Sequence, residues 1–483
     1  MEPISRRRAL QLGGLGLASS IVGGVGLAWG GNSRFEPVTG AAMVEPQVLR
    51  SADGLLQVRL EAAEGSVRVA GREATALGYN GGFPGPTLLL QPGDRLRVQL
   101  ANRLGDPTNL HVHGLHVSPE GNGDNAFVTV DAGESFDYDY QLPDDHPPGV
   151  YWYHPHLHGM VAEQVFGGLY GAIIVADVQE LPVTRERVLV ISDITFDGSG
   201  RIPPASSTAR MMGREGDLLL VNGQASPVLN ARPGERERWR VVNACAARYL
   251  RLSLDGQQVQ LLGFDSGRLP APQDVEEVVL APGNRADLLV TAGQGSSQLQ
   301  ALPYDRGAMM GMMGSGGNSS ATGTAVTVAA LEVAGSEVAA LPPVPAQPEP
   351  RDLQGMAVTA RRELTFAMGM AMGGGAMSFT IDGNEFDPDR VDQEVSVGTI
   401  EEWTITNNSP MDHPLHLHVW PMQIVEQDGQ PIRDPSWQDV VNVPAESRVK
   451  VRVAFDAFPG RTVYHCHILD HEDSGMMGVI NAS

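Results

Sequence analysis

Histidines occur in this chain mostly as pairs separated by one residue. Twelve of the 13 histidines lie in four short clusters, and His146 stands apart in an Asp-Asp-His-Pro-Pro segment. On a β-strand, residues i and i+2 point to the same side, so each pair presents two imidazoles together. Imidazole binds copper, zinc, iron and nickel. The clusters therefore predict a metal centre, and they are His111-Val-His113-Gly-Leu-His116, His154-Pro-His156-Leu-His158, His413-Pro-Leu-His416-Leu-His418, and His465-Cys466-His467 with His471.

The fourth cluster favours copper over zinc. On a strand, Cys466 points away from the histidines on either side of it. Together with His413, His471 and Met476 it supplies two imidazoles, a thiolate and a weak thioether, which is the ligand set of a blue-copper electron-transfer site. Zinc prefers Cys and His sets without a thioether. The remaining eight imidazoles are enough for three more copper ions, and they are His111, His113, His154, His156, His416, His418, His465 and His467.

Composition excludes several other functions. The chain has 483 residues, with 34 Lys and Arg against 57 Asp and Glu, a net charge of −23. Such a charge argues against binding to nucleic acid. With only two cysteines, a disulfide-stapled scaffold is excluded. We expect Cys466 to be occupied by copper and Cys245 to be a buried, inert thiol.

A repeated pattern predicts the elements that position the histidines. In three stretches a turn glycine is followed nine positions later by an asparagine, with alternating apolar and polar positions between them that are typical of a half-buried strand. Each follows a turn at Asn80-Gly81, Asn222-Gly223 or Asp382-Gly383, and each precedes a second turn at Asp131–Glu134, Ala281–Asn284 or Val443–Glu446. The pattern predicts three homologous β-domains, and its copies are Gly93–Asn102, Gly234–Asn243 and Gly398–Asn407.

The N-terminus has the composition of an export signal. Ser5-Arg-Arg-Arg8 precedes a glycine-rich, moderately apolar stretch up to about Trp29. The paired arginines resemble a twin-arginine signal, which is read by the twin-arginine translocation machinery. A membrane anchor is the alternative. A proline-rich connector lies at residues 341–350, and residues 307–323, rich in Gly, Met and Ser, are expected to form a mobile loop.

With these motifs, the chain resembles the multicopper oxidases of the three-domain bacterial laccase and copper-efflux oxidase type. The resemblance covers about residues 45–483 and rests on the order, spacing and residue types of all four clusters. It implies an all-β fold of three consecutive cupredoxin-like Greek-key domains, each a β-sandwich or barrel. The expected division is a signal and linker (1–44), domain 1 (45–178), domain 2 without copper ligands (185–335), a Pro-rich linker (336–355) and domain 3 (356–483).

The resemblance also assigns a role to each ligand. It implies one type 1, one type 2 and two type 3 copper ions, so that one-electron oxidation of a reductant is coupled to four-electron reduction of O2 to water. His111 and His416 then bind the type 2 ion, and His413, Cys466 and His471 bind the type 1 ion with Met476 axial. The type 3 ligands are His113, His154, His156, His418, His465 and His467.

Reduction of O2 consumes four protons, which a carboxylate beside the cluster can relay. Glu472, directly after His471, matches the acidic residue that family members use. Asp124 is the candidate on the other side, although the segment 118–125 departs from the family spacing, and a plain turn residue is an equal alternative. His116 and His158 fall outside the ligand set and are expected to pack near it, and His146 is expected to be solvated.

Methionines favour Cu(I) as the reductant. Thioethers are soft ligands for Cu(I), and Met309, Met310, Met312 and Met313 lie in one Gly-rich segment. A second group comprises Met368, Met370, Met372 and Met377. Met411 and Asp412 precede His413, where copper-efflux members of the family place residues for a substrate copper ion. The alternative is that these methionines only fill gaps.

Other functions stay open at this point. The runner-up reductants are phenols and aromatic amines, as in laccases. A non-enzymatic exported copper protein, a copper nitrite reductase and a copper store are weaker alternatives, because every ligand of the oxidase set is present. We expect a monomer in the periplasm or at the cell-envelope exterior.

Overall fold

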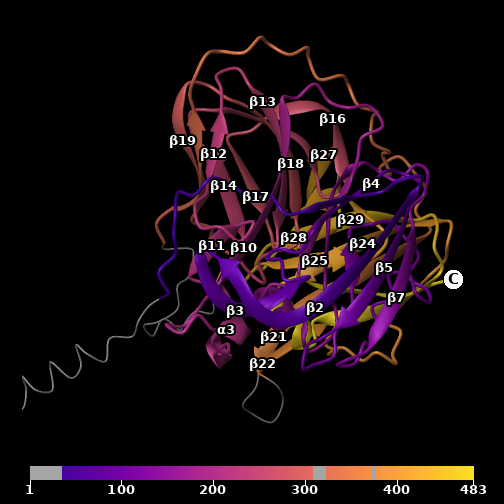
Figure 1. Cartoon of the computed structure of the whole chain (residues 1–483). Coiled ribbons are helices and arrows are strands. Elements are labelled where there is room, and N and C mark those ends of the chain that lie inside the picture. The colour runs from indigo at the N-terminus through magenta and orange to yellow at the C-terminus, as the bar shows by residue number, and fades with distance from the viewer. Residues whose placement is uncertain (1–34, 308–322, 371–376) are drawn as a thin grey trace, which may run out of the picture.

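The computed structural model describes residues 35–307, 323–370 and 377–483. Strands dominate this part of the chain (Figure 1), and its helices are short: α2 (Val161–Gly167), α3 (Ser207–Met212) and α4 (Leu469–Asp473). The strands form six sheets that pair along the chain, so the all-β prediction is confirmed. Within the described ranges, no helix is both long and apolar enough to cross a membrane. The predicted twin-arginine signal lies outside these residues.

The first pair of sheets comes from the N-terminal third of the chain. One sheet has the order β3-β2-β5-β7 and the other β1-β4-β9-β8-β6. The bounds are β1 (Val48–Arg50), β2 (Leu55–Val69), β3 (Arg72–Tyr79), β4 (Thr87–Leu90), β5 (Arg95–Asn102), β6 (His111–His113), β7 (Ser135–Gln141), β8 (Gly149–His154) and β9 (Gly171–Val175).

The second pair of sheets follows in the middle of the chain. One sheet has the order β11-β10-β13-β18-β15-β16 and the other β12-β20-β19-β14-β17. The bounds are β10 (Arg185–Ile194), β11 (Leu218–Val221), β12 (Val228–Ala231), β13 (Arg236–Asn243), β14 (Leu250–Leu254), β15 (Gln258–Phe264), β16 (Gly267–Asp274), β17 (Glu277–Leu280), β18 (Arg285–Thr291), β19 (Gly295–Leu302) and β20 (Val326–Val333).

The third pair of sheets contains the C-terminus. One sheet has the order β22-β21-β24-β29-β26-β27 and the other β23-β31-β30-β25-β28. The bounds are β21 (Ala360–Met370), β22 (Met377–Ile381), β23 (Gln393–Val395), β24 (Thr399–Asn407), β25 (His413–Leu417), β26 (Met422–Gln427), β27 (Gln430–Gln438), β28 (Val440–Val443), β29 (Arg448–Phe455), β30 (Gly460–Cys466) and β31 (Met477–Ala482).

The three copies of the sequence repeat have the same place in the three pairs. The repeat strands β5, β13 and β24 each have one parallel neighbour (β2, β10 and β21) and one antiparallel neighbour (β7, β18 and β29). The turn before each copy is a two-residue turn with both φ angles positive, as in Asn80-Gly81 (53° and 71°). Asn, Asp and Gly tolerate this conformation, which explains why they occupy the turn that precedes each copy.

The asparagine that ends each copy fixes the chain after the strand. In the middle copy, Asn243 is fully buried, and its Nδ2 donates to the carbonyls of Arg248 and Leu280 at 2.9 Å each. Its Oδ1 accepts the N–H of Cys245 at 3.1 Å. Asn102 and Asn407 make the same kind of bonds in the other two copies.

The second turn of the repeat differs in the third copy. Gly133 and Gly283 have a φ of 87°, whereas in the third copy the left-handed residue is Glu446, with a φ of 52°. The equivalent positions are therefore shifted by one residue from the match between Val443–Glu446 and Asp131–Glu134 that the sequence suggests.

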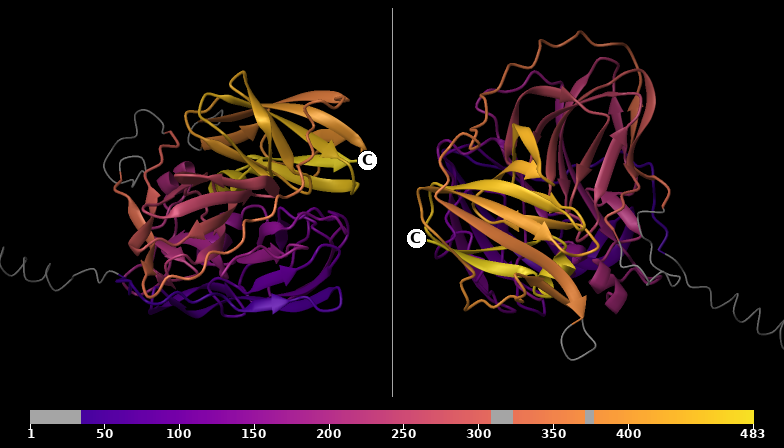
Figure 2. Two further views of the ribbon diagram at one scale, coloured as in Figure 1. Left: turned by 90° about the horizontal axis from the view of Figure 1, so that it is seen from above. Right: turned by 180° about the vertical axis from the view of Figure 1, so that it is seen from behind.

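Histidine-bearing strands are neighbours within the first and third pairs of sheets. β6 pairs antiparallel with β8, so that His111 lies opposite His154. β25 pairs antiparallel with β30, so that His416 lies opposite His465. Figure 2 shows the C-terminal sheets (yellow) lying over the N-terminal ones (indigo to purple), with the middle pair (magenta to pink) alongside both. This arrangement brings the four histidine segments together.

A long connector joins the second and third pairs of sheets. Residues 334–359 contain no helix or strand, and they run along the outside of the molecule (orange in Figure 2). Leu353 is fully buried within this connector. Its carbonyl accepts a hydrogen bond of 2.6 Å from Arg452, which attaches the connector to β29.

We predict that Asn243→Ala lowers the free energy of unfolding by about 3 kcal/mol, because it leaves buried backbone groups without partners. Urea unfolding followed by tryptophan fluorescence measures the change. Asn230→Ala is the matched control, since Asn230 lies exposed on β12 of the same pair of sheets, and it should change stability by less than about 0.5 kcal/mol. Equal effects of the two variants would contradict the role given to the repeat asparagine.

Candidate metal centre

Eight histidines meet at the interface between the N-terminal and C-terminal pairs of sheets. Each is at most 2% exposed. The first and third pairs of sheets contribute four histidines each, from β6, β8, β25, β30 and the residues directly after these strands. The set is His111, His113, His154, His156, His416, His418, His465 and His467, the same eight imidazoles that the sequence singled out.

Ring nitrogens from different sheets face one another across this interface. His111 Nε2 lies 3.3 Å from His416 Nε2. His156 Nε2 lies 3.0 Å from His465 Nε2, and His418 Nε2 lies within 3.3 Å of both. These distances bring ligand atoms from both ends of the chain into one site.

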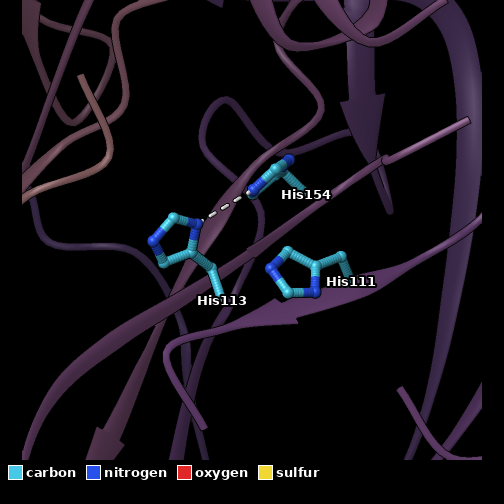
Figure 3. Close-up of side chains that lie close together, drawn as sticks. All are labelled: His111, His113 and His154. Atoms are coloured by element: carbon cyan, nitrogen blue, oxygen red, sulfur yellow. Dashed lines mark hydrogen bonds between the residues drawn. The ribbon is translucent and has the colours of Figure 1, made fainter. Parts of the chain in front are cut away.

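A further group of nitrogens lies on β6 and β8. His113 Nδ1 is 3.4 Å from His154 Nε2, as the dashed line in Figure 3 shows, and His111 lies beside them. His467 contacts this group: its ring centre is 4.9 Å from that of His113 and 5.7 Å from that of His154. The division of the eight rings into sets of two, three and three stays a prediction.

The outer nitrogens of several rings face hydrogen-bond acceptors, which fixes their tautomers. His416 Nδ1 lies 2.7 Å from the carbonyl of Asp439, and His154 Nδ1 lies 2.8 Å from the carbonyl of Pro155. A carbonyl can only accept, so these Nδ1 atoms carry the proton and Nε2 keeps a lone pair for a metal. In His113 the two ring nitrogens have the opposite roles. Its Nε2 faces Asp439 Oδ1 at 3.0 Å, so its Nδ1 faces the other histidines.

The inner nitrogens fit a cluster of metal ions. Burial lowers the pKa of all eight histidines, so they are neutral imidazoles, the form that binds metal. Lone pairs that face one another cannot hydrogen-bond, and neither nitrogen of His467 has a hydrogen-bond partner. Buried polar atoms are normally paired. Copper ions between the rings would satisfy them, and imidazole is a ligand that copper accepts.

A second, separate group of ligands lies in the C-terminal pair of sheets. His413 Nδ1 is 3.4 Å from Cys466 Sγ and 3.4 Å from His471 Nδ1, and Cys466 Sγ is 4.0 Å from His471 Nδ1. In both histidines, the ring nitrogen that faces away from Cys466 makes a hydrogen bond. His413 Nε2 bonds Ser409 Oγ at 2.7 Å, and His471 Nε2 bonds the carbonyl of Met211 at 3.0 Å. Both Nδ1 atoms therefore face the sulfur, as in a trigonal His2Cys site.

Cys466 and Met476 belong to one apolar core, whose Phe366 and Phe379 rings contact His413 and His471. Cys466 and Met476 are fully buried, and the Met476 carbonyl accepts the N–H of Cys466 at 3.0 Å. Burial raises the pKa of the Cys466 thiol, an effect that a coordinated cation reverses. The axial role of Met476 stays a prediction.

Two buried carboxyl groups lie beside the eight histidines. Glu472 Oε2 is 3.0 Å from His465 Nδ1, and its Oε1 is 3.4 Å from His156 Nε2. Asp124 lies within 3.0 Å of His111 Nδ1 through both carboxylate oxygens and accepts the N–H of Val112 at 3.1 Å. Burial raises the pKa of each carboxyl group to about 7. The structure thus brings both predicted acids to the cluster.

The histidines outside the ligand set differ in exposure. His158 is exposed and packs on Phe386, with ring centres 4.7 Å apart. His116 donates from Nδ1 to the carbonyl of Val419 at 2.8 Å. The prediction that His146 is solvated is wrong. It is 2% exposed, and its Nε2 accepts the N–H of His116 because the Pro-rich segment folds back onto the His111 motif.

The residues predicted to bind a substrate copper ion form two groups, of which the structure describes one. Met309, Met310, Met312 and Met313 are outside the described residues. Met411 is fully buried. The Asp412 carboxylate already accepts hydrogen bonds from Tyr304, Asn442 and the N–H of Ala445, at 2.8 to 3.0 Å. Asp412 therefore has its hydrogen bonds within the protein.

Sequence reasoning missed three residues that hold the ligands in place. Asp439 contacts two histidines of the cluster, Ser409 holds His413, and Met211 on α3 holds His471. Ser409 follows the repeat asparagine by two residues, which could have pointed to it. The other two belong to no motif, because their contacts arise between segments far apart in the chain. Cys245 is buried and free, as predicted.

Comparisons with known proteins agree with this geometry. Three family models described as multicopper oxidase match residues 61–180, 186–330 and 351–483. Together these matches span each of the three pairs of sheets.

Relatives and a solved structure match along most of the chain. The multicopper oxidase mco of Staphylococcus haemolyticus is 29% identical over 423 residues, 85% of this chain and 84% of the relative. The cell division protein FtsP of Sodalis glossinidius is 29% identical over 490 residues, 98% of each chain. A multicopper oxidase structure from Campylobacter jejuni, described as a metallo-oxidase, has a TM-score of 0.82 at 29% identity and covers 94% of this chain and 98% of its own. The chain belongs to the multicopper oxidase family and is a copper-dependent oxidoreductase that uses O2 as its oxidant.

Proposed function

We propose that the chain binds four copper ions and oxidises Cu(I) in the cell envelope. Type 1 copper is assigned to His413, Cys466 and His471, with Met476 axial, and type 2 copper to His111 and His416. The two type 3 ions are assigned to one set of three histidines each: His113, His154 and His467 in one, and His156, His418 and His465 in the other.

Bound at these sites, copper supplies one-electron oxidation of the reductant and four-electron reduction of O2 to water. The chain contributes the connection between the two sites. Cys466 lies directly between His465 and His467, and its sulfur faces His413 and His471. A few covalent bonds of the backbone therefore join the thiolate to a histidine of each type 3 set.

Proton supply is assigned to the two buried carboxyl groups. A general acid works best with a pKa near the working pH, and the pKa of Glu472 and of Asp124 lies at about 7. Glu472 contacts His156 and His465, and Asp124 contacts His111. Each can hold a proton at a carboxylate oxygen beside a different face of the cluster.

The proposal that Cu(I) is the reductant rests on the residues that surround His471. His471 is fully buried, and its outer nitrogen, Nε2, bonds the carbonyl of Met211. A phenol therefore cannot reach that nitrogen without moving α3. Instead, the partly buried side chains of Met211, Met368 and Met377 pack against the apolar core that contains the type 1 ligands. Their thioethers are soft ligands that suit Cu(I).

Phe379 connects these methionines to the type 1 ligand. Its ring stacks on His471 with centres 4.3 Å apart. Met368 lies directly opposite Phe379 on the neighbouring strand, and Met377 is two residues away on the same face of β22. Cu(I) held by these thioethers would lie close to His471.

Two alternatives remain in view. Phenols are the second class of reductant, and a structural role has support from the similarity to the cell division protein FtsP. The complete set of eight histidines, with a separate His2Cys site, favours an enzyme over a structural protein. Export by the twin-arginine machinery is part of the proposal and rests on Arg6, Arg7 and Arg8 in the sequence.

We predict that Cys466→Ser removes the blue absorption and the oxidase activity together, because the thiolate is the strongest ligand of the type 1 ion. Copper analysis should give three ions per chain instead of four. Optical absorption and O2 uptake with Cu(I) and with a phenol measure these changes. Cys245→Ser is the matched control and should keep colour, copper and turnover. Retained turnover of the Cys466 variant would refute the assignment of electron entry.

We predict that Glu472→Gln slows O2 reduction by about 100-fold, in line with the loss of a general acid, and leaves the type 1 absorption unchanged. Stopped-flow reoxidation of the fully reduced enzyme separates this step from reduction by substrate. Glu385→Gln provides a control carboxylate, since Glu385 is exposed. Unaltered reoxidation of the Glu472 variant would remove this residue from proton supply.

We predict that the triple change of Met211, Met368 and Met377 to Leu lowers kcat/KM for Cu(I) at least 10-fold and that for a phenol by less than twofold. Leucine keeps the apolar volume and removes the soft ligand. O2 uptake with each reductant in parallel measures both values. Met43→Leu with Met356→Leu is the control, because Met43 packs in the middle pair of sheets and Met356 is 40% exposed.

A variant with Leu at Met309, Met310, Met312 and Met313 forms the second arm of this experiment. If only that variant loses Cu(I) oxidation, the Gly-rich segment supplies the substrate and the site beside His471 is wrong. If neither loses it, or if both reductants are affected equally, Cu(I) is not the preferred reductant.

A further inference from the structure

The middle pair of sheets has no histidine, yet one of its turns reaches the candidate copper cluster. Residues 281–284 form the turn before β18, which begins at Arg285. Gly283, with a φ of 87°, lies against the ring of His467, where a Cβ would come within 2.9 Å of three ring atoms. Only glycine fits this approach without a shift of the ring. The turn therefore forms one wall of the site.

Arg285, two residues later, is a buried cation in the same wall. Its side chain is 0% exposed. Its two terminal nitrogens donate to the two carboxylate oxygens of Asp439 at 2.6 Å each, a paired geometry that is strong and directional. Its Nε and Nη1 also bond the carbonyls of Val150 and Gly283 at 3.0 and 3.2 Å, and Nη1 lies 3.2 Å from Oδ1 of a second buried carboxylate, Asp265. Arg285 thus links all three pairs of sheets.

Asp439, which Arg285 holds in place, accepts hydrogen bonds from two histidines. Its Oδ1 accepts from His113 Nε2 at 3.0 Å, and its backbone carbonyl accepts from His416 Nδ1 at 2.7 Å. The two rings stack, with centres 3.8 Å apart and an angle of 9° between them. One residue therefore turns the Nδ1 of His113 and the Nε2 of His416 towards the cluster.

The arginine is needed to keep Asp439 in this role. A buried carboxylate that loses its only bidentate partner is strongly destabilised in its place, and its side chain either turns away or stops accepting from His113. Either outcome frees His113, whose tautomer depends on that acceptor. The first histidine motif is also shaped around the pair: a Cβ on Gly114 would meet Arg285 Nη2 at 2.4 Å and Asp439 Oδ2 at 2.9 Å.

We propose that Arg285 is a positioning residue of the trinuclear copper site. Through Asp439 it holds His113 and His416 with the correct nitrogens facing the copper ions, so the middle domain controls a site to which it contributes no ligand. This inference rests on the proposed four-copper function. It concerns only the type 2 and type 3 ions, because Arg285 has no contact with the residues assigned to type 1 copper.

The test compares Arg285→Met with Arg238→Met in copper-loaded protein. Arg238 is the matched control: it is equally buried, lies on β13 next to β18, and pairs with Asp287, Asp177 and Glu186. Loss of a group that orients a metal ligand weakens metal binding by about 10- to 100-fold. We expect that loss for two of the four copper ions in the Arg285 variant, the type 2 ion assigned to His416 and the type 3 ion assigned to His113, measured by chelator titration with copper analysis.

Two spectroscopic readouts separate positioning from general damage. The type 1 blue absorption should stay within about 20% of wild type in the Arg285 variant, while the type 2 electron paramagnetic resonance signal changes or disappears. Arg285→Lys should recover part of the affinity, since lysine keeps the charge but cannot bond both oxygens in the same way. The Arg238 variant should lose thermal stability with both copper signals retained.

The outcomes are distinguishable from a failure of the proposed function. Wild-type protein that binds fewer than four copper ions would contradict the proposed function itself. Four ions in wild type, with unchanged trinuclear affinity and type 2 signal in Arg285→Met, would overturn only the positioning role. Parallel loss of type 1 and trinuclear copper in both arginine variants would also overturn it, because the arginines would then act only on folding.

Discussion

Eight neutral imidazoles buried with their lone pairs facing one another are the constraint on which this structure depends. Such an arrangement is unfavourable without a bound cation, because buried polar atoms need partners. The two outer pairs of sheets each supply four of these rings, so neither holds a complete set by itself. The metal site therefore requires the outer pairs to be docked, and anything that fixes their relative position also fixes the chemistry.

Helix α4 shows how that position is fixed. It contains His471 and Glu472. The acidic residues on either side of these two, Asp470 and Asp473, bond to the other two pairs of sheets. Asp470 pairs with Arg214 of the middle pair at 2.7 Å. Asp473 accepts the N–H groups of Gly159, Val161 and Ala162, and so caps α2, whose own N-cap residue provides no side-chain bond. These five residues thus align His471 and Glu472 with both other parts of the molecule.

The fold and the meeting of the histidines could be predicted from the sequence because both depend on local patterns. Alternation, the Asn-Gly turns and the repeat asparagines specify three similar β-units, and His-x-His spacing places two rings on one side of a strand. The residues that support the ligands could not be predicted in this way. Arg285 and Asp439 are 154 positions apart, and neither belongs to a motif. His146 was assigned to solvent for the same reason, since its burial depends on a segment folding back.

The docking of the middle pair of sheets also limits access to the group formed by His413, Cys466 and His471. The side of His471 that faces away from Cys466 is covered by the Met211 carbonyl of the middle pair and by the ring of Phe379. The proposed preference for Cu(I) over a flat organic reductant rests on this cover, because a single ion can approach through thioether side chains that adapt their rotamers. The middle pair of sheets, which has no histidine of its own, meets both groups of candidate ligands. Its Arg285 bonds Asp439, which contacts His113 and His416, and the Met211 carbonyl on α3 bonds His471, so the geometry of both groups depends on how this part of the chain docks.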